Sequence, residues 1–309
     1  MNSPLIDPLD TAPQAVRLQG LYKDFGDRRA LDGLDLAVPE GAVYVLVGPN
    51  GAGKTTTLKI LLDLLRPDSG SAEAFGVPVV EEGPWVRAQV GFVADDHSFG
   101  MPQVSVGILL DHHRRYFGTW DDGYAQALTR RLEIDRKAIF GKLSKGQARR
   151  VQLLLALAHR PALLLMDEPT DGLDPLAREN FAEILADHLA AAPTTLLLST
   201  HLVHEVEGLG DHLGVIRAGR VLAQLSRDDL NRRLHRLRAM IPEAWSPPPE
   251  VAAAVVGRRA AGREIEWTVA GDRQQIQEAV AGSGATVHEL RALNLEEASK
   301  ALLKMERPR

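Results

Sequence analysis

The stretch Gly48-Pro49-Asn50-Gly51-Ala52-Gly53-Lys54-Thr55 decides the fold of this chain, because it fits the phosphate-loop pattern G-x-x-x-x-G-K-[ST]. Its glycines let the backbone close into a nest of N–H groups, and a helix that starts there adds the positive end of its dipole. The stretch lies between the apolar run Val43–Val47, typical of a buried strand, and the helically spaced Thr55–Leu65. Lys54 would reach the β- and γ-phosphates of a nucleotide, and the Thr55 hydroxyl would ligate Mg²⁺. We therefore predict nucleoside triphosphate binding by Gly48, Pro49, Asn50, Gly51, Ala52, Gly53, Lys54, Thr55 and Thr56.

Strand and helix patterns alternate on both sides of this loop. Buried strands are predicted at Ala162–Met166 and Thr195–Ser199, and each has a helical segment before it, Ala148–His159 and Pro175–Ala190. Alternating apolar and polar residues predict half-buried strands at Val16–Gln19 and Leu34–Val38. This order indicates an α/β fold with a parallel sheet. The segment Val104–Phe140 carries few strand signals, so we expect it to form a mostly helical inserted subdomain.

The length of 309 residues fits about two domains. Beyond Leu230 the composition changes to a basic tract, Asn231–Met240, and then to a stiff break at Ser246–Pro249. A small α+β domain is predicted after this break, with strands Val251–Val256, Glu264–Val269 and Ala285–Leu290 and helices Arg273–Ala281 and Leu295–Met305. The predicted organisation is a flexible arm at 1–14, a nucleotide-binding domain at 15–230 with its helical subdomain at about 96–155, and an accessory domain at 231–309.

Composition excludes several classes of protein. The chain has no cysteine, which excludes disulfides, cysteine-based zinc and iron–sulfur sites and a thiol nucleophile. The net charge of −5 gives no global basic field for nucleic acid. No apolar run approaches the roughly 20 residues of a membrane span, and the first residues lack the basic start of a signal peptide. We expect a soluble cytoplasmic protein.

An acidic pair follows the second predicted strand. Asp167 would be delivered to the carboxyl end of Leu163–Met166, the edge where open α/β sheets bind ligands, and would hold Mg²⁺ through its water shell. Glu168 would polarise an attacking water as a general base. A surface acidic pair that merely closes a strand is the competing interpretation, and the upstream phosphate loop favours the catalytic one.

Leu143-Ser144-Lys145-Gly146-Gln147 opens the helix before that strand, and by itself Ser144 is a common helix N-cap. In order with the phosphate loop and the acidic pair, it resembles the LSGGQ signature of ABC-type ATPases. Asp171-Gly172-Leu173-Asp174 resembles the D-loop of that family, Ser199-Thr200-His201 its switch histidine, and Lys23-Asp24-Phe25-Gly26 its adenine-stacking aromatic loop. The resemblance extends over most of residues 15–225.

This resemblance implies a P-loop NTPase fold of the ABC type and a head-to-tail homodimer that sandwiches two ATP molecules. Ser144, Gly146 and Gln147 of one subunit would contact the γ-phosphate held by the other, and a second helix N-terminus aimed at a polyanion is favourable. Catalysis would rest on Glu168, His201 and Lys54, with ATP stacked on Phe25 and Mg²⁺ held by Thr55, Asp95 and Asp167. Thr119-Trp120-Asp121, the form LSKGQ and the C-terminal extension look most like ATP-binding subunits of ABC-2-type exporters. The expected function is therefore ATP hydrolysis that powers a separate membrane permease, with the protein peripheral on the inner face of the cell membrane.

The chain departs from the family pattern at three positions. Asp95 stands where the Q-loop glutamine is usual, which puts the coupling to the helical subdomain in doubt. Lys145 replaces the second glycine of the signature and adds positive charge near phosphate. Asp171 stands where the D-loop usually has serine.

Several alternatives remain open from the sequence. Tyr22 competes with Phe25 as the adenine platform, and the segment Phe99–Trp120, with Met101, Tyr116, Phe117 and Trp120, is either a permease-docking face or helix core. His201 and His204 would make only two ligands of a metal site, and His112-His113 is expected to be exposed. A soluble ABC-type ATPase acting on nucleic acid or ribosomes through Arg232–Arg238 is the second function considered, although we expect no nucleic acid partner because charge runs are usually solvated. A small-molecule kinase is the third, and it leaves LSKGQ and Ser199–His201 unexplained.

Overall fold

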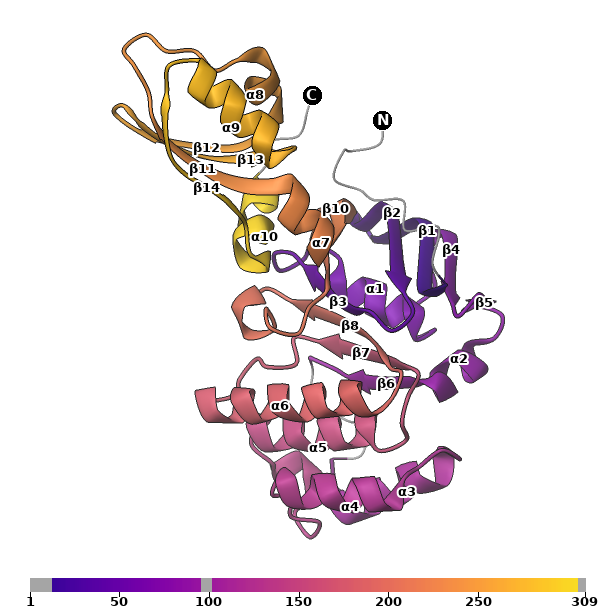
Figure 1. Cartoon of the computed structure of the whole chain (residues 1–309). Coiled ribbons are helices and arrows are strands. Elements are labelled where there is room, and N and C mark those ends of the chain that lie inside the picture. The colour runs from indigo at the N-terminus through magenta and orange to yellow at the C-terminus, as the bar shows by residue number, and fades with distance from the viewer. Residues whose placement is uncertain (1–12, 96–101, 305–309) are drawn as a thin grey trace.

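The computed structural model describes residues 13–95 and 102–304 of the chain (Figure 1). The predicted arm lies outside these residues up to position 12, and Gln14 already begins the first strand. Met101 and Met305 also lie outside them.

A six-stranded sheet forms the centre of the molecule, in the order β10-β9-β3-β8-β7-β6. Its strands are β3 (Val43–Val47), β6 (Val90–Val93), β7 (Leu163–Asp167), β8 (Thr195–Thr200), β9 (His212–Arg217) and β10 (Arg220–Ser226). Neighbouring strands run parallel from β9 to β6, and β10 adds an antiparallel edge. The parallel strands direct their carboxyl ends to one edge of the sheet, so residues that follow them come together there.

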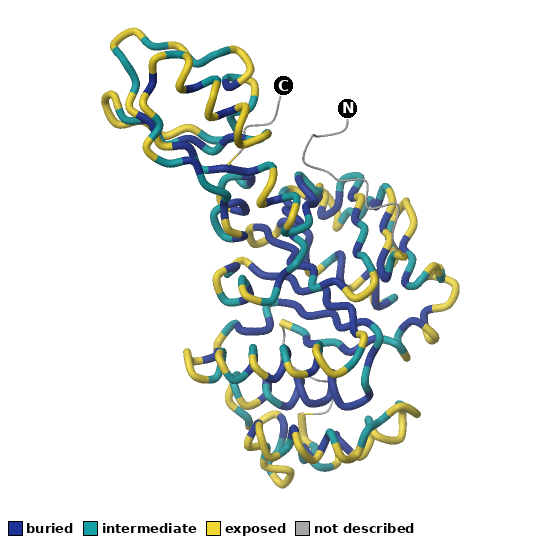
Figure 2. Tube along the Cα trace, in the orientation of Figure 1, coloured by how far each residue is buried: buried dark blue, intermediate teal, exposed yellow. Residues whose placement is uncertain are grey.

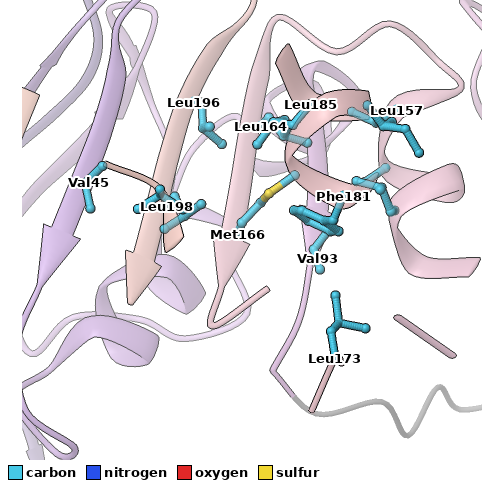
Figure 3. Packing of buried hydrophobic residues seen from close by; sticks show 14 of the residues in the cluster. Val45, Val93, Leu157, Leu164, Met166, Leu173, Phe181, Leu185, Leu196 and Leu198 are labelled. Atoms are coloured by element: carbon cyan, nitrogen blue, oxygen red, sulfur yellow. The ribbon is translucent and has the colours of Figure 1, made fainter. Parts of the chain in front are cut away.

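Both faces of this sheet are covered, because successive residues of a strand point to opposite sides. Val45, Leu164, Met166 and Leu198 pack toward α5 (Lys145–Leu157) and α6 (Pro175–Ala191), as the side chains in Figure 3 show. Their neighbours pack on the other side against α1 (Lys54–Leu61), α2 (Gly83–Gln89) and an antiparallel sheet. Figure 2 shows the result, a buried centre with exposure confined to the periphery.

The antiparallel sheet has the order β2-β1-β4-β5. It is built from β1 (Gln14–Phe25), β2 (Arg28–Pro39), β4 (Ser69–Ala74) and β5 (Val77–Pro78). The long hairpin of β1 and β2 brings its tip, residues 25–28, toward the phosphate loop, because Gly219 accepts a hydrogen bond from Asp32 N at 3.0 Å and donates one to Ala52 O at 2.9 Å. The hairpin is thereby joined to the nucleotide end of the central sheet.

The helical subdomain lies beyond α5 and α6, at the end of the molecule away from the C-terminal sheet (Figure 1). It contains α3 (Val106–Tyr116), α4 (Asp122–Arg131) and the 3₁₀ turn η1 (Phe140–Lys142). The prediction that residues 104–140 are mostly helical is confirmed.

The C-terminal segment forms a second antiparallel sheet in the order β12-β13-β11-β14. Its strands are β11 (Leu234–Met240), β12 (Val255–Ala261), β13 (Glu264–Ala270) and β14 (Thr286–Ala292), and its helices are α8 (Pro249–Ala254) and α9 (Arg273–Gly282). Leu237, Ile265, Trp267 and Val280 belong to a separate small core between this sheet and its helices. The chain enters this accessory sheet after α7 (Arg227–Arg233) and leaves it before α10 (Leu295–Lys304). Leu293 N donates to Leu234 O at 3.0 Å, so entrance and exit are adjacent.

Helix α10 does not belong to the small core. Its buried residues Leu295, Ala298 and Leu302 are part of the main core together with Val45 and Leu213 of the central sheet. Arg217 of β9 donates to Leu303 O at 2.6 Å. The last helix of the described chain therefore belongs to the main core, although the 61 residues 234–294 separate it from α7 along the chain.

Two sequence predictions for the C-terminal segment are wrong. Val251, expected in a strand, lies in α8, because the prolines before it supply the first turn of a helix. The strand β11 lies within the basic tract, where no strand was expected. Its buried residues Leu237 and Ala239 alternate with the exposed Arg238 and Met240, which is the period of a strand. None of the described helices combines the length and the apolar character that crossing a membrane requires.

Candidate functional site

The phosphate loop joins β3 to α1, as its sequence predicts. Gly53 caps the start of α1 with φ +114°, a backbone conformation that favours glycine, and a Cβ there would lie 2.7 Å from Leu31 Cδ2. A Cβ on Gly48 would collide with the carbonyl oxygen of Ile216 in β9. The pattern glycines are therefore required by packing as well as by the nest.

Lys54 is almost fully buried, with 6% of its surface exposed. Its Nζ donates to Gly48 O at 2.7 Å and lies 3.2 Å from Glu168 Oε1, which has no hydrogen-bond partner among the described residues. An ammonium held between the loop carbonyl and this carboxylate is placed where phosphate oxygens would meet it.

Asp167 ends β7 with both carboxylate oxygens engaged. Oδ2 accepts from the Thr55 hydroxyl at 2.7 Å, and Oδ1 accepts from the Ser199 hydroxyl at the end of β8. The described residues contain no cluster of three or more histidine, aspartate or glutamate side chains that could hold a metal alone. This donor set fits Mg²⁺, which binds proteins through one or two carboxylates and takes its remaining ligands from water and substrate phosphates.

Glu168 adopts φ +45°, an uncommon conformation for a residue with a side chain. Its backbone N–H donates to Ser199 O at 2.9 Å, and its Oε2 lies 2.8 Å from His201 Nδ1 and accepts from His201 N at 3.2 Å. The structure therefore brings the predicted base and the predicted switch histidine into direct contact. Backbone strain of this kind is often found at functional sites, so it marks Glu168 as a candidate functional residue.

Asp95 follows β6 at the same edge of the sheet. Burial, and after it the negative charge of Asp167, raise the pKa of Asp95. The fully buried Arg149 holds the backbone here, since its guanidinium donates to Ala94 O and to Asp95 O. Arg149 is a functional candidate that sequence reasoning missed, because only folding brings α5 beside the end of β6.

The signature residues start α5 in a capping box. Ser144 Oγ accepts from Gln147 N at 3.2 Å, and Gln147 Oε1 accepts from Ser144 N at 2.9 Å. A Cβ on Gly146 would lie 3.6 Å from Leu173 of the loop after β7. Within one chain, these residues are thus placed beside residues 170–174.

Phe25 lies at the tip of the β1–β2 hairpin with half of its surface exposed, and Lys23 Nζ sits 5.8 Å from the ring centre. Tyr22 is only partly exposed, and its hydroxyl points toward Gly33, where a Cβ would lie 2.9 Å from it. The exposed face of Phe25 favours it over Tyr22 as a stacking platform. Arg28, which sequence reasoning also missed, reaches across to the phosphate loop, because a Cβ on Gly51 would lie 2.6 Å from its Nη2.

An apolar cavity of about 330 Å³ lies between β6, α3 and α5. Its lining includes Leu64, Tyr116, Phe117 and His159, and Phe117 stacks on His159 with ring centres 4.0 Å apart. Tyr116 is 71% exposed, whereas Trp120 packs against the main core. The predicted docking segment thus divides: Tyr116 and Phe117 line a cavity, Trp120 is core, and Met101 lies outside the described residues.

The competing interpretations gain no support from the geometry. His201 is paired with Glu168, and no described group of metal-ligating side chains includes His204. In the basic tract, Arg238 pairs with Glu264 at 2.7 Å and Arg232 with Asp229 at 2.5 Å. These arginines are paired with carboxylates of the same chain, so they give no support to a nucleic-acid surface.

The chain is similar to known proteins over about two thirds of its length or more. A family model described as ABC transporter matches residues 31–171. The Nod factor export ATP-binding protein I of Cupriavidus metallidurans is 41% identical over 214 residues, which cover 68% of this chain and 70% of that protein. The daunorubicin/doxorubicin resistance ATP-binding protein DrrA of Streptomyces peucetius is 36% identical over 249 residues, 77% of this chain and 74% of that protein.

Solved structures show the same fold. An ATP-binding subunit of an ABC transporter superposes with a TM-score of 0.63 at 26% identity, covering 70% of this chain and 92% of that one. A dimeric bacterial ABC transporter cassette gives a TM-score of 0.60 at 24% identity, covering 68% of this chain and 98% of that one.

Proposed function

The chain belongs to the ABC transporter family, and from that premise we propose that it is the ATP-hydrolysing subunit of an exporter whose membrane path is supplied by a separate permease. The similarity to ATP-binding proteins of Nod factor export and daunorubicin resistance supports export as the direction of transport. The observation that carries the proposal is the meeting of Lys54, Asp167, Glu168 and His201 at the carboxyl ends of β3, β7 and β8.

Each of these side chains has a role in hydrolysis. Lys54 would hold the β- and γ-phosphates, and Glu168 would take the proton of the attacking water. His201, whose Nδ1 lies 2.8 Å from Glu168 Oε2, would hold that carboxylate in position relative to the γ-phosphate. Mg²⁺ held by Thr55 and Asp167, with Asp95 as a further oxygen ligand, would neutralise phosphate charge.

A second copy of the chain would complete each site. The chain carries one set of motifs, and Ser144, Gly146 and Gln147 lie at the N-terminus of α5, where backbone N–H groups and the helix dipole favour an anion. In a head-to-tail dimer they would contact the γ-phosphate on the partner's phosphate loop. The solved dimeric cassette with the same fold supports this arrangement.

The cavity between β6, α3 and α5 is the proposed docking site for the permease, on the inner face of the membrane. Its lining is mainly apolar, and Tyr116 and Leu64 are exposed at 71% and 62%. An amphipathic helix would bury such side chains, because helix-in-groove recognition rests on a few apolar anchors.

The first test replaces the base. Glu168→Gln should lower ATP turnover by about 10²-fold or more while ATP binding persists, because general-base catalysis is lost and the phosphate loop is intact. Light scattering of this variant with ATP and Mg²⁺ should show a dimer. Glu133→Gln, an exposed carboxylate paired with Arg150, is the control and should hydrolyse normally. Normal turnover by the Glu168 variant would remove it as the base, and a persistent monomer would count against the sandwich.

The second test concerns docking. Tyr116→Asp should reduce recovery of the protein with membranes that contain its permease, and should leave ATP turnover of the purified protein unchanged. Ile108→Asp changes an equally exposed apolar side chain of α3 that does not line the cavity, so it should remain membrane-associated. Equal recovery of the two variants would place the permease elsewhere.

A further inference from the structure

Two positions at which the sequence departs from the family pattern are in direct contact. Lys145 Nζ donates to Asp171 Oδ2 at 2.6 Å, although 26 residues separate them. We propose that this ion pair is a positioning link that fixes the start of α5 to the loop carrying Glu168, and that it couples ATP held by the partner subunit to hydrolysis in this chain's own site. The inference rests on the proposed dimer and adds to it a route of communication between the two sites.

Electrostatics explains why the two residues occur together. Lys145 is the first residue of α5, where a cation opposes the positive end of the helix dipole. The Asp171 carboxylate, at hydrogen-bond distance, offsets this unfavourable interaction between the lysine charge and the helix dipole. The Lys145 ammonium in turn holds the pKa of Asp171 below its usual range, so the carboxylate of Asp171 is ionised at neutral pH.

Packing makes the contact tight. Gly172 has φ +79°, and a Cβ there would lie 2.6 Å from Cδ of Lys145, so the lysine stem crosses directly over the loop backbone. Leu173 is buried, and a Cβ on Gly146 would lie 3.6 Å from its Cδ2. A displacement of the α5 start would therefore carry the loop with it.

The other side of the same loop is anchored independently. The Thr170 hydroxyl donates to Glu205 in the 3₁₀ turn η2 (Val203–Glu205), and Glu205, with 4% of its side chain exposed, also pairs with Arg178 of α6. Glu168, with its strained φ, precedes both anchors in the chain, and its carbonyl oxygen accepts a hydrogen bond from Asp171 N at 3.1 Å. A movement of Asp171 together with α5 would therefore act on the backbone of Glu168 through this hydrogen bond.

Lys145 could act in two ways, through its ion pair with Asp171 or by binding the partner's phosphate directly. The two differ in the effect expected when Asp171 is replaced. If Lys145 acted only on the partner's γ-phosphate, Asp171 would compete for the ammonium, and its removal would not lower turnover. If the link matters, loss of either charge has the same effect and loss of both adds little, because residues that act through one interaction are not additive.

The experiment is steady-state ATP hydrolysis by the full chain as a function of ATP concentration. Lys145→Met and Asp171→Asn should each lower kcat about threefold to tenfold and bring the Hill coefficient toward one, with half-saturation changed less than about twofold. The double variant should match either single one. Lys145→Arg and Asp171→Glu keep the charges and should retain most of the turnover and the cooperativity.

The control is Asp187→Asn, which breaks the Arg131–Asp187 pair of 2.5 Å between α4 and α6, away from the phosphate loop, and should leave kcat and the Hill coefficient unchanged. Wild-type kinetics in Asp171→Asn would overturn the link, as would a loss confined to Lys145→Met, which would assign the lysine to phosphate binding. Absence of hydrolysis in the wild-type protein would instead overturn the proposed function. Thermal unfolding of each variant separates misfolding from loss of coupling. If Lys145→Met or Asp171→Asn does not fold, the kinetics of Lys145→Arg and Asp171→Glu test the link instead.

Discussion

At the scale of single residues, the adenine end of the site depends on the exposed ring of Phe25. Phe25→Ala should raise the KM for ATP about tenfold with little change in kcat, because stacking of a base on an aromatic ring contributes about 1–3 kcal/mol. Phe25→Trp should retain affinity. Tyr22→Ala is the comparison, and a larger effect there, in ATP titrations of folded protein, would make Tyr22 the platform.

Arg28 is a second residue whose role follows from its position beside Gly51. Arg28→Ala should raise the KM for ATP about threefold to tenfold at low salt and less at high salt, because an exposed cation acts through screened electrostatics. Arg29→Ala on the same hairpin removes a guanidinium already held by Asp24 and Asp32, and should change KM less. A KM independent of position 28 at all salt concentrations would exclude the contact with phosphate.

The residue types of the site could be predicted from the sequence because the chemistry is local: the phosphate loop, Asp167-Glu168 and His201 each follow a strand end. Arg28, Arg149 and Glu205 could not, because each acquires its role through a contact between segments far apart in the chain. The same holds for Lys145 and Asp171, which the sequence marks as unusual without revealing that they touch.

At the scale of elements, α4 and α6 are joined through a buried histidine. His188 Nδ1 lies 3.1 Å from the Tyr124 hydroxyl, and Nε2 lies 3.3 Å from the Thr194 hydroxyl. Burial lowers the pKa of His188 to about 4 from 6.5. The folded state therefore keeps it neutral where the unfolded chain takes up a proton, and its contribution to stability is complete above pH 6.5 and lost as the pH falls toward 4.

His188→Gln should flatten the fall in the free energy of unfolding between these pH values, measured by urea denaturation. It should not abolish the fall, since burial also lowers the pKa of His159 to about 4. His112→Gln, at an exposed position of α3, should leave the pH profile as it is. An unchanged profile in the His188 variant would show that this ring does not titrate with folding.

Elements of the central sheet could be predicted because burial on both faces leaves continuous apolar runs, as in Leu163–Met166. The incorrect predictions lie where the local sequence pattern and the tertiary contacts favour different structures. β11 has the composition of a basic tract, and its arginines form ion pairs with Glu264 and Glu266 on β13. These partners become visible only when the two strands are paired in the structure. The prolines before Val251 were predicted to break the chain, and instead they start a helix.

At the scale of the whole molecule, α10 makes the end of the described chain part of the nucleotide-binding core. Leu302→Ala, at a fully buried position, should lower the free energy of unfolding by about 2–5 kcal/mol and should do so in the transition that also reports loss of ATP binding. Lys300→Ala on the exposed face of α10 should cost well under 1 kcal/mol, the range of a helix-surface ion pair. An unchanged core transition in Leu302→Ala would mean that the accessory segment and α10 unfold together and apart from the core.

The adjacent entrance and exit of the accessory sheet have a consequence for redesign of the chain. Because Leu293 N donates to Leu234 O at 3.0 Å, the residues between them begin and end at neighbouring points, as an inserted domain does. A protein engineer can therefore exchange this sheet: a short Gly-Ser bridge or a foreign domain with neighbouring termini would span these two residues, once the side chains of α10 that the sheet covers are made polar.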